Sequence, residues 1–198
     1  MRPLVWTDWW ALATAAIPAA WLLAIEVGTS RRVPAEQRVR DHEIDSATGR
    51  WFDLSAVASM AGTAAASIGW TDMTIQPRSA SWAVGVVTMA AAIGVSTSAR
   101  AHLGRFHRHA LTSHSNHELV STGPYRFVRH PIYSATILAF VGIGLTLGNW
   151  LGLALMAVLP TAALVHRIRV EEPILHERLG DTYAEFCTGR ARLVPGVW

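Results

Sequence analysis

The stretch IYSATILAFVGIGLTLGNWLGLALMAVLPTAALV, residues 132–165, decides the fold because its 34 residues include no charged side chain. As a single helix it would be about 51 Å long, whereas the hydrocarbon core of a bilayer is about 30 Å thick. Gly148 and Asn149 lie at its midpoint, and both residue types tolerate the backbone dihedrals of a tight turn. The stretch therefore predicts two membrane-spanning helices joined as a hairpin.

Three more segments lack charged side chains: residues 9–25, 54–71 and 79–99. Each is close to the roughly 20 residues that one bilayer crossing needs. Hydrophobic residues make up 51% of the 198, and the mean hydropathy is +0.27, which is too apolar for an ordinary soluble protein. The sequence predicts an all-α integral membrane protein with five transmembrane helices, of which the last two form the hairpin.

The distribution of arginine gives an independent test of this span count. All 17 basic side chains are arginine, and the segments before, between and after the five predicted spans carry one, five, one, five, none and five of them. Because cytoplasmic loops of membrane proteins are enriched in basic residues, this alternation predicts an outside N-terminus and a cytoplasmic C-terminal segment. It also explains the net charge of +3 without a nucleic-acid partner. A cleaved signal peptide is the alternative for residues 9–25, but its positive charge should precede the apolar run.

Two expectations concern the first half of the chain. Residues 28–50 are polar and rich in arginine, which predicts a cytoplasmic loop, partly disordered. In the second span, the four-residue spacing of Ala58, Gly62 and Ala66 favours close helix packing. Alanine richness combined with the lack of lysine is typical of a GC-rich bacterial genome, so we expect a bacterial inner membrane as the location.

Two polar clusters flank the hairpin. Before it, Pro131 follows His130, which predicts a helix that begins at the proline and holds the imidazole and Tyr133 at its entrance. After it, Arg167 and Glu171 are four positions apart and share one helix face. A hairpin would bring the two clusters together at the cytoplasmic membrane surface. The alternative is ordinary: interfacial arginine and aromatic residues, and a surface ion pair.

Other polar residues carry weaker expectations. Glu172 points about 100° away from Glu171 and is expected in solvent. The single cysteine, Cys187, excludes an intrachain disulfide and a thiolate metal cluster. The histidines near the third span lack the spacing of a helical zinc site, so we predict solvated histidines and no metal. These histidines are His102, His107, His109, His114 and His117.

The combination of motifs on both sides of the hairpin resembles the isoprenylcysteine carboxyl methyltransferases, which are integral-membrane, S-adenosylmethionine-dependent enzymes related to phospholipid N-methyltransferases. The resemblance covers roughly residues 116–196 and lies in the motifs HELV (117–120), GPY (123–125), RHPIY (129–133), RIRVEE (167–172), LGDTY (179–183) and LVPG (193–196). Two departures are Phe186, where family members often have tyrosine, and Ser134-Ala135, where a glycine is common.

The resemblance implies a fold with the cofactor site built from the loop before the fourth span and the helix after the fifth. The charge-free runs predict one membrane domain over residues 1–198 with three spans in residues 1–100, and the resemblance makes residues 101–198 a methyltransferase-like region. It assigns Arg167 and Glu171 as catalytic, with Arg167 also binding the substrate. The implied cofactor-binding residues are His117, Glu118, Leu119, Val120, Tyr125, His130, Pro131, Ile132, Tyr133 and Glu171.

The cofactor implied is S-adenosylmethionine, and the acceptor is a lipophilic molecule that enters from the bilayer among membrane lipids. An ionised carboxylate needs no base but does need an orienting cation, which the Arg167 guanidinium supplies, whereas an amine would be repelled. We therefore expect carboxyl O-methylation of the isoprenylcysteine kind. The alternatives are a phospholipid or amine N-methyltransferase, an NADPH-dependent enzyme resembling sterol reductases, and a non-enzymatic membrane scaffold.

Overall fold

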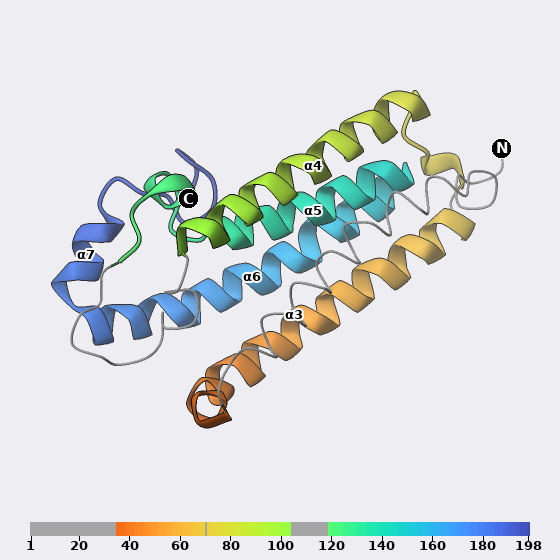
Figure 1. The fold of residues 1–198 in the computed structure, drawn as a ribbon. Coiled ribbons are helices and arrows are strands. Elements are labelled where there is room, and N and C mark those ends of the chain that lie inside the picture. Colours follow the sequence, from red (N-terminus) through yellow and green to blue (C-terminus); the bar gives the residue numbers. More distant parts are fainter. Residues whose placement is uncertain (1–34, 70, 104–118) are drawn as a thin grey trace.

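A computed structural model describes residues 35–69, 71–103 and 119–198 of the chain. The regular structure of these residues is helical, in agreement with the predicted all-α class (Figure 1). The elements are α3 (Ala35–Gly69), the short 3-10 helix η1 (Thr71–Met73), α4 (Arg78–Leu103), the 3-10 helix η3 (Gly123–Arg126), α5 (Pro131–Leu147), α6 (Trp150–Leu179) and α7 (Asp181–Cys187). The first predicted span, residues 9–25, lies outside the described residues.

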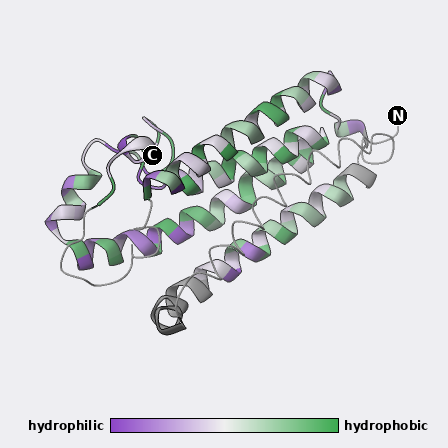
Figure 2. Ribbon diagram, viewed as in Figure 1, coloured by the Kyte–Doolittle hydropathy of each residue, from purple (hydrophilic) through white to green (hydrophobic). Residues whose placement is uncertain are grey.

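The four long helices pack side by side in the order α4, α5, α6, α3 (Figure 1). The chain reverses direction from each helix to the next, so the end of α4, the start of α5 and the end of α6 lie at the same end of the molecule. Helices α7 and η3 and residues 188–198 gather there too, and we call this the polar end. Figure 2 shows that hydrophilic residues are concentrated at this end.

The predicted hairpin is confirmed. Helix α5 ends at Leu147, and Gly148 adopts a left-handed conformation with φ of 69°, which glycine accepts without strain. The Gly148 N–H donates to the carbonyls of Gly144 and Leu145, both at 3.1 Å. Asn149 then caps α6, because its side-chain oxygen accepts from the Gly152 N–H at 3.1 Å.

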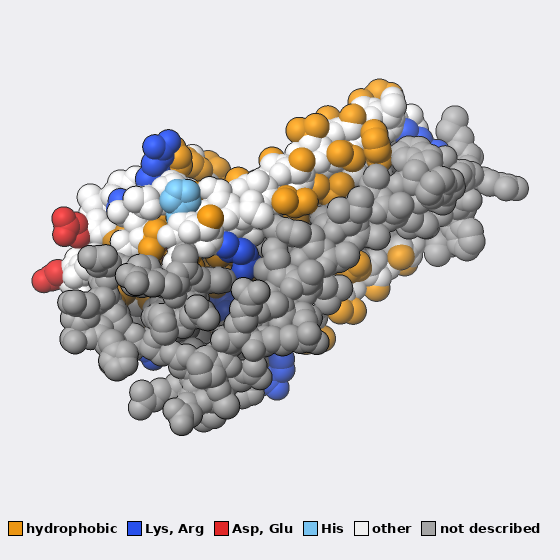
Figure 3. Space-filling model, viewed as in Figure 1, with side chains coloured by type: hydrophobic (Ala, Val, Ile, Leu, Met, Phe, Trp, Pro, Cys, Tyr) orange, Lys and Arg blue, Asp and Glu red, His pale blue; other side chains and the backbone are white. Residues whose placement is uncertain are grey.

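Helices α4 and α6 are long and apolar enough to cross a membrane, judged by length and composition, and α5 is a shorter apolar helix. Several large apolar side chains on them are exposed, among them Val84, Val87 and Val158. Figure 3 shows such side chains distributed over the outer surface of α4, with acidic side chains at the polar end of the molecule. Two of the predicted spans, α4 and α6, are thus long and apolar enough to cross a membrane, and the count of five spans stays a prediction.

The expected polar loop over residues 28–50 is wrong from Ala35 onward, because α3 begins there. Residues 35–48 contain neither glycine nor proline, and alanine, glutamate, glutamine and arginine favour helices. Local propensity therefore extends the apolar helix into its polar flank.

Small residues let the helices approach closely. A Cβ atom at Gly62 of α3 would lie 2.7 Å from Leu155 Cδ1 of α6, and Ala66 is fully buried, as predicted. Ala58, by contrast, is exposed, because a strict four-residue spacing drifts around a helix of 3.6 residues per turn. Ser59 and Thr63 take its place, and both are buried.

The contact between α4 and α5 gives a direct test of this packing. A Cβ atom at Gly142 would lie 2.5 Å from Met89 Cγ and 3.0 Å from the Gly85 carbonyl oxygen. We expect Gly142→Ala to destabilise the protein by about 1–3 kcal/mol, because the backbones must separate. The measurement is thermal unfolding in detergent, followed by tryptophan fluorescence.

The matched control is Gly94→Ala on α4, where an added Cβ would meet nothing within 4 Å. Its stability should stay the same or rise by up to about 1 kcal/mol, because alanine favours helix over glycine. Equal destabilisation by the two substitutions would contradict close packing at Gly142.

Candidate functional site

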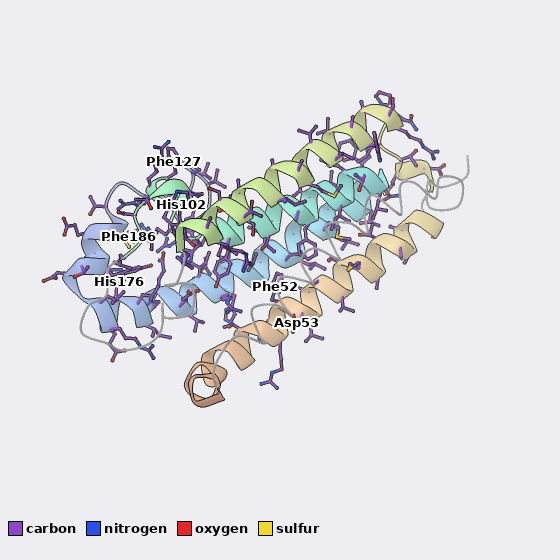
Figure 4. The ribbon with its side chains drawn as sticks, in the orientation of Figure 1. Phe52, Asp53, His102, Phe127, His176 and Phe186 are labelled. Carbon is purple, nitrogen blue, oxygen red and sulfur yellow. The ribbon has the colours of Figure 1, made fainter. Side chains whose placement is uncertain are left out.

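The candidate site begins at η3, whose first residue, Gly123, packs against the end of α4. Gly123 has a φ of 60°, and a Cβ atom there would lie 2.6 Å from the His102 ring, so both conformation and space require glycine. His102 lies on α4, with Nδ1 2.8 Å from the Ser98 carbonyl oxygen. Figure 4 shows His102 and Phe127 together at the polar end. The contact between Gly123 and His102 therefore holds the start of η3 against the end of α4.

Tyr125, in η3, is buried. Burial raises the pKa of its hydroxyl to about 12, with nearby Arg100 acting to lower it and nearby Glu171 to raise it. The hydroxyl is therefore protonated near neutral pH.

The start of α5 agrees with the prediction from the His-Pro pair. His130 has non-helical dihedrals (φ −121°, ψ 61°), and Pro131 is the first helical residue. The His130 ring stacks on the Tyr133 ring with centroids 5.3 Å apart and planes 5° from parallel. The stack fixes the Tyr133 ring at the entrance of the hairpin.

The predicted convergence of the two polar clusters is confirmed. The Tyr133 hydroxyl donates to Glu171 Oε2 at 2.8 Å and accepts from Arg167 Nε at 2.9 Å. The Arg167 guanidinium also lies 5.8 Å from the centre of the Tyr133 ring. One phenol oxygen from α5 thus joins a cation and an anion of α6, which are 34 and 38 residues away in sequence.

Glu172 corrects an expectation, because it is buried rather than in solvent. Its Oε1 accepts from Arg129 Nη1 at 3.1 Å, and its Oε2 accepts from Arg192 Nε at 2.7 Å. His130 Nε2 lies 3.5 Å from Oε1. The 100° step from Glu171 turns Glu172 towards the segment before α5 and residues 188–198, which cover it. A hydrogen bond from His130 to a cofactor would therefore have to use Nδ1.

The pKa of Glu172 reflects these partners. Burial alone would raise it, but the nearby His130 ring, the hydrogen bond from Arg192 and the charges of Arg192 and Arg129 outweigh burial and hold the pKa at about 2, below its ordinary 4.5. The carboxylate is therefore ionised at any physiological pH. The buried Glu172 carboxylate therefore holds Arg129, His130 and Arg192 together at the polar end.

Helix α7 packs against the end of α6 through Tyr183. The buried Tyr183 ring meets His176 edge to face, with centroids 4.7 Å apart, and stacks on Phe186 at 5.9 Å. His176 and Phe186 are labelled in Figure 4. The Arg190 guanidinium lies 4.7 Å from the Phe186 ring. Phe186 therefore packs through its ring alone, and tyrosine is not needed there.

The remaining predicted site residues have these positions. Leu119 and Val120 are half-buried and precede η3, while Pro131 and Ile132 form the first turn of α5. His117 and Glu118 lie outside the described residues, as do His107, His109 and His114. The described part of the chain contains no group of three or more His, Cys, Asp or Glu side chains placed to hold a metal ion.

Sequence reasoning missed three residues of the polar end. From the sequence, Arg129 belongs to the RHPIY motif without a role of its own, Ser134 stands only as part of a departure from the family pattern, and Arg192 carries no expectation. Arg192 had no local signal, because its partner lies 20 residues earlier. Ser134 had no local signal either, because the carbonyl of Leu193 to which it donates lies 59 residues later.

Comparison with known proteins agrees with this geometry. The sequence pattern of the phospholipid methyltransferase family matches residues 80–182, more than half of the chain, and the chain belongs to this family. The matched region contains Tyr125, Tyr133, Arg167 and Glu171.

Two curated relatives are similar over a shorter region. The protein-S-isoprenylcysteine O-methyltransferase of Schizosaccharomyces pombe is 32% identical over 92 residues, which are 46% of this chain and 39% of the relative. The protein-S-isoprenylcysteine O-methyltransferase A of Arabidopsis thaliana is 34% identical over 82 residues, which are 41% of this chain and 42% of the relative. The chain thus spans about two fifths of the length of these relatives.

The Glu172 cluster predicts a pH-dependent stability. Because its folded pKa of about 2 lies below the ordinary 4.5, the stabilisation is complete above about pH 5 and is lost as pH falls from 4.5 towards 2. We expect Glu172→Gln to cost about 2 kcal/mol at pH 7, with the difference from wild type shrinking below pH 4.5. Thermal unfolding at a series of pH values measures it.

Glu177→Gln is the matched control, since Glu177 is an exposed glutamate on the same helix. It should follow the wild-type curve at every pH. A Glu172→Gln curve that also follows wild type at pH 7 would contradict a stabilising role for the cluster.

Proposed function

We propose that this protein is an integral-membrane methyltransferase that moves a methyl group from S-adenosylmethionine to a lipophilic carboxylate. The observation that carries the proposal is the Tyr133 hydroxyl bridge between Arg167 and Glu171 at the polar end of the hairpin. Membership of the phospholipid methyltransferase family supports the reaction class. The names of the two relatives, both O-methyltransferases, support the choice of oxygen as acceptor atom.

The residues of the site fit the proposed donor. S-adenosylmethionine carries a sulfonium cation, an ammonium group and a ribose diol, which call for an anion and for aromatic faces. Glu171 supplies a carboxylate, which has about four acceptor positions and gives one of them to Tyr133. The Tyr125 and Tyr133 rings supply aromatic faces for a cation. Main-chain groups of Leu119 and Val120 are suited to holding an adenine.

Each side chain has a separate task in this proposal. Glu171 binds the donor, and Tyr133 holds Glu171 and Arg167 in register through its hydroxyl. Arg167 orients the acceptor, because a planar guanidinium matches a carboxylate. When bound, the donor supplies an electrophilic methyl group on sulfur. No residue acts as a base, because an ionised carboxylate has no proton to lose.

The reaction also suits a site at a membrane surface. The acceptor oxygen forms a bond to the methyl carbon while the carbon–sulfur bond breaks and its electron pair stays on sulfur. A carboxylate and a sulfonium thereby become a neutral ester and a neutral thioether, and no proton is released. Loss of opposite charges is favoured where water is excluded. The task of the protein is alignment and exclusion of water.

Topology follows from the arginine pattern and from the shape of the hairpin. We infer that the polar end faces the cytoplasm of a bacterial cell, where the donor is made, and that the acceptor enters sideways from the inner membrane. The described arginine-rich segments support this, because Arg100, Arg129 and Arg192 all belong to the polar end, whereas Arg78 begins α4 at the opposite end.

A second candidate is N-methylation of a phospholipid amine, which the family's description favours. Arg167 favours a carboxylate instead, since its cation would repel an ammonium acceptor before deprotonation. The two reactions differ in their product. Esters are cleaved by mild base, whereas methylated amines are not.

We therefore expect base-labile methylation. Purified protein incubated with labelled S-adenosylmethionine and a total membrane lipid extract should transfer label to the lipid phase, and mild base should release that label as methanol. Label that resists base would favour an amine as acceptor. Absence of label in every lipid fraction would contradict methyltransferase activity. Boiled protein is the control.

Arg167 gives the matching residue test. Arg167→Ala should lower turnover by at least about 100-fold while the affinity for the donor falls by less than about tenfold, because the guanidinium orients the acceptor. Arg167→Lys should recover only part of the rate, since an ammonium lacks the planar fork. The measurements are the label transfer rate and donor titration. Turnover retained in Arg167→Ala would contradict this role.

A further inference from the structure

Residues 188–198, which we call the tail, lie against the segment that enters α5. The Arg129 N–H donates to the Ala191 carbonyl at 2.8 Å, and the His130 N–H donates to the Arg192 carbonyl at 3.1 Å. Val128 and Ala191 pair as an isolated parallel bridge. The tail therefore binds the backbone on which the His130 ring is mounted.

Side chains add two attachments on either side of this backbone pairing. Arg192 Nε donates to the buried Glu172 carboxylate at 2.7 Å, and Glu172 also accepts from Arg129. Ser134 Oγ donates to the Leu193 carbonyl at 2.6 Å, and Leu193 is buried. One attachment joins the tail to α6 and the other joins it to the first turn of α5.

The tail also has a defined shape of its own. The N–H groups of Arg192 and Leu193 donate to the main-chain oxygen of Trp198 at 2.7 and 3.1 Å, which closes residues 192–198 into a loop. The Arg192 guanidinium lies 4.9 Å from the Trp198 ring. A closed loop holds Arg192 in one orientation better than an extended chain would.

A short path leads from the tail to the proposed donor site. Glu172 and the tail backbone hold His130, the His130 ring stacks on Tyr133, and the Tyr133 hydroxyl joins Arg167 and Glu171. Neither Arg192 nor Ser134 touches that hydroxyl bridge in the contacts of the described residues. Their influence on it must pass through the position of His130 and the first turn of α5.

We propose that the tail is a clamp in which Arg192 and Ser134 act as positioning residues for the donor site, by fixing the His130–Tyr133 stack. This inference rests on the proposed function. Loosening the clamp weakens donor binding, and binding of the donor at saturation restores the position of Tyr133 and, with it, of Arg167.

The test combines two measurements on the full-length protein in detergent. The first is hydrogen exchange of the peptide covering residues 125–134, which reports the attachment whether or not the protein is a methyltransferase. The second is calorimetric titration with S-adenosylmethionine, together with label transfer at low and saturating donor. The variants are Arg192→Ala, Ser134→Ala and Arg192→Lys. The control is Arg169→Ala, which removes an exposed arginine of α6.

We expect faster exchange in residues 125–134 and about tenfold weaker donor binding in Arg192→Ala, with a smaller effect of the same kind in Ser134→Ala. Turnover at saturating donor should stay within about twofold of wild type, whereas general destabilisation would lower it at every donor concentration. Arg192→Lys should lie between Arg192→Ala and wild type, and Arg169→Ala should match wild type. If Arg192→Ala does not fold, Ser134→Ala alone tests the clamp, because it removes a single hydroxyl oxygen and is the smaller change.

Two results would overturn the clamp: unchanged exchange in residues 125–134, or faster exchange with unchanged donor affinity in both alanine variants. Failure of the proposed function has a different signature, since wild type itself would then bind no donor. In that case the proposed role of the clamp at a donor site fails together with the proposed function. The exchange measurement still decides whether the tail holds residues 125–134.

Discussion

The Tyr133 hydroxyl is the contact on which the polar end of the molecule depends. It accepts from Arg167 and donates to Glu171, so a single oxygen holds a cation and an anion of α6 against the start of α5. The contact is possible because the hairpin reverses the chain at Gly148 and Asn149 and returns α6 to the level where α5 began. Close packing of small residues keeps the helices in that register.

Two neighbouring glutamates of α6 have different surroundings and different tasks. Glu171 faces Tyr133 and the side from which we infer that the donor binds, whereas Glu172 faces Arg129, His130 and Arg192 and is buried. The helix geometry separates them by about 100°. Glu172 ties the supporting segments together, and its burial is tolerated because its charge is compensated, while Glu171 stays on the side of the proposed donor site.

The sequence predicted features that depend on local chemistry or on the length of an apolar run. The hairpin followed from a charge-free stretch too long for one crossing with Gly148-Asn149 at its centre, and the start of α5 followed from the His130-Pro131 pair. The burial of Glu172 could not be predicted, because it depends on Arg192, which packs there only after α7 reverses the chain. The polar start of α3 differs from the predicted loop because polar residues with high helix propensity occur in loops and helices alike.

The central claim is that the joined residues Tyr133, Arg167 and Glu171 form a binding site for S-adenosylmethionine. Calorimetric titration of the purified protein with S-adenosylmethionine and, separately, with NADPH tests this claim most directly when it is repeated on Glu171→Gln. We predict saturable binding of S-adenosylmethionine, at least about tenfold weaker binding in Glu171→Gln, and no binding of NADPH. Binding of NADPH in place of S-adenosylmethionine, or affinity for S-adenosylmethionine that Glu171→Gln leaves unchanged, would contradict it.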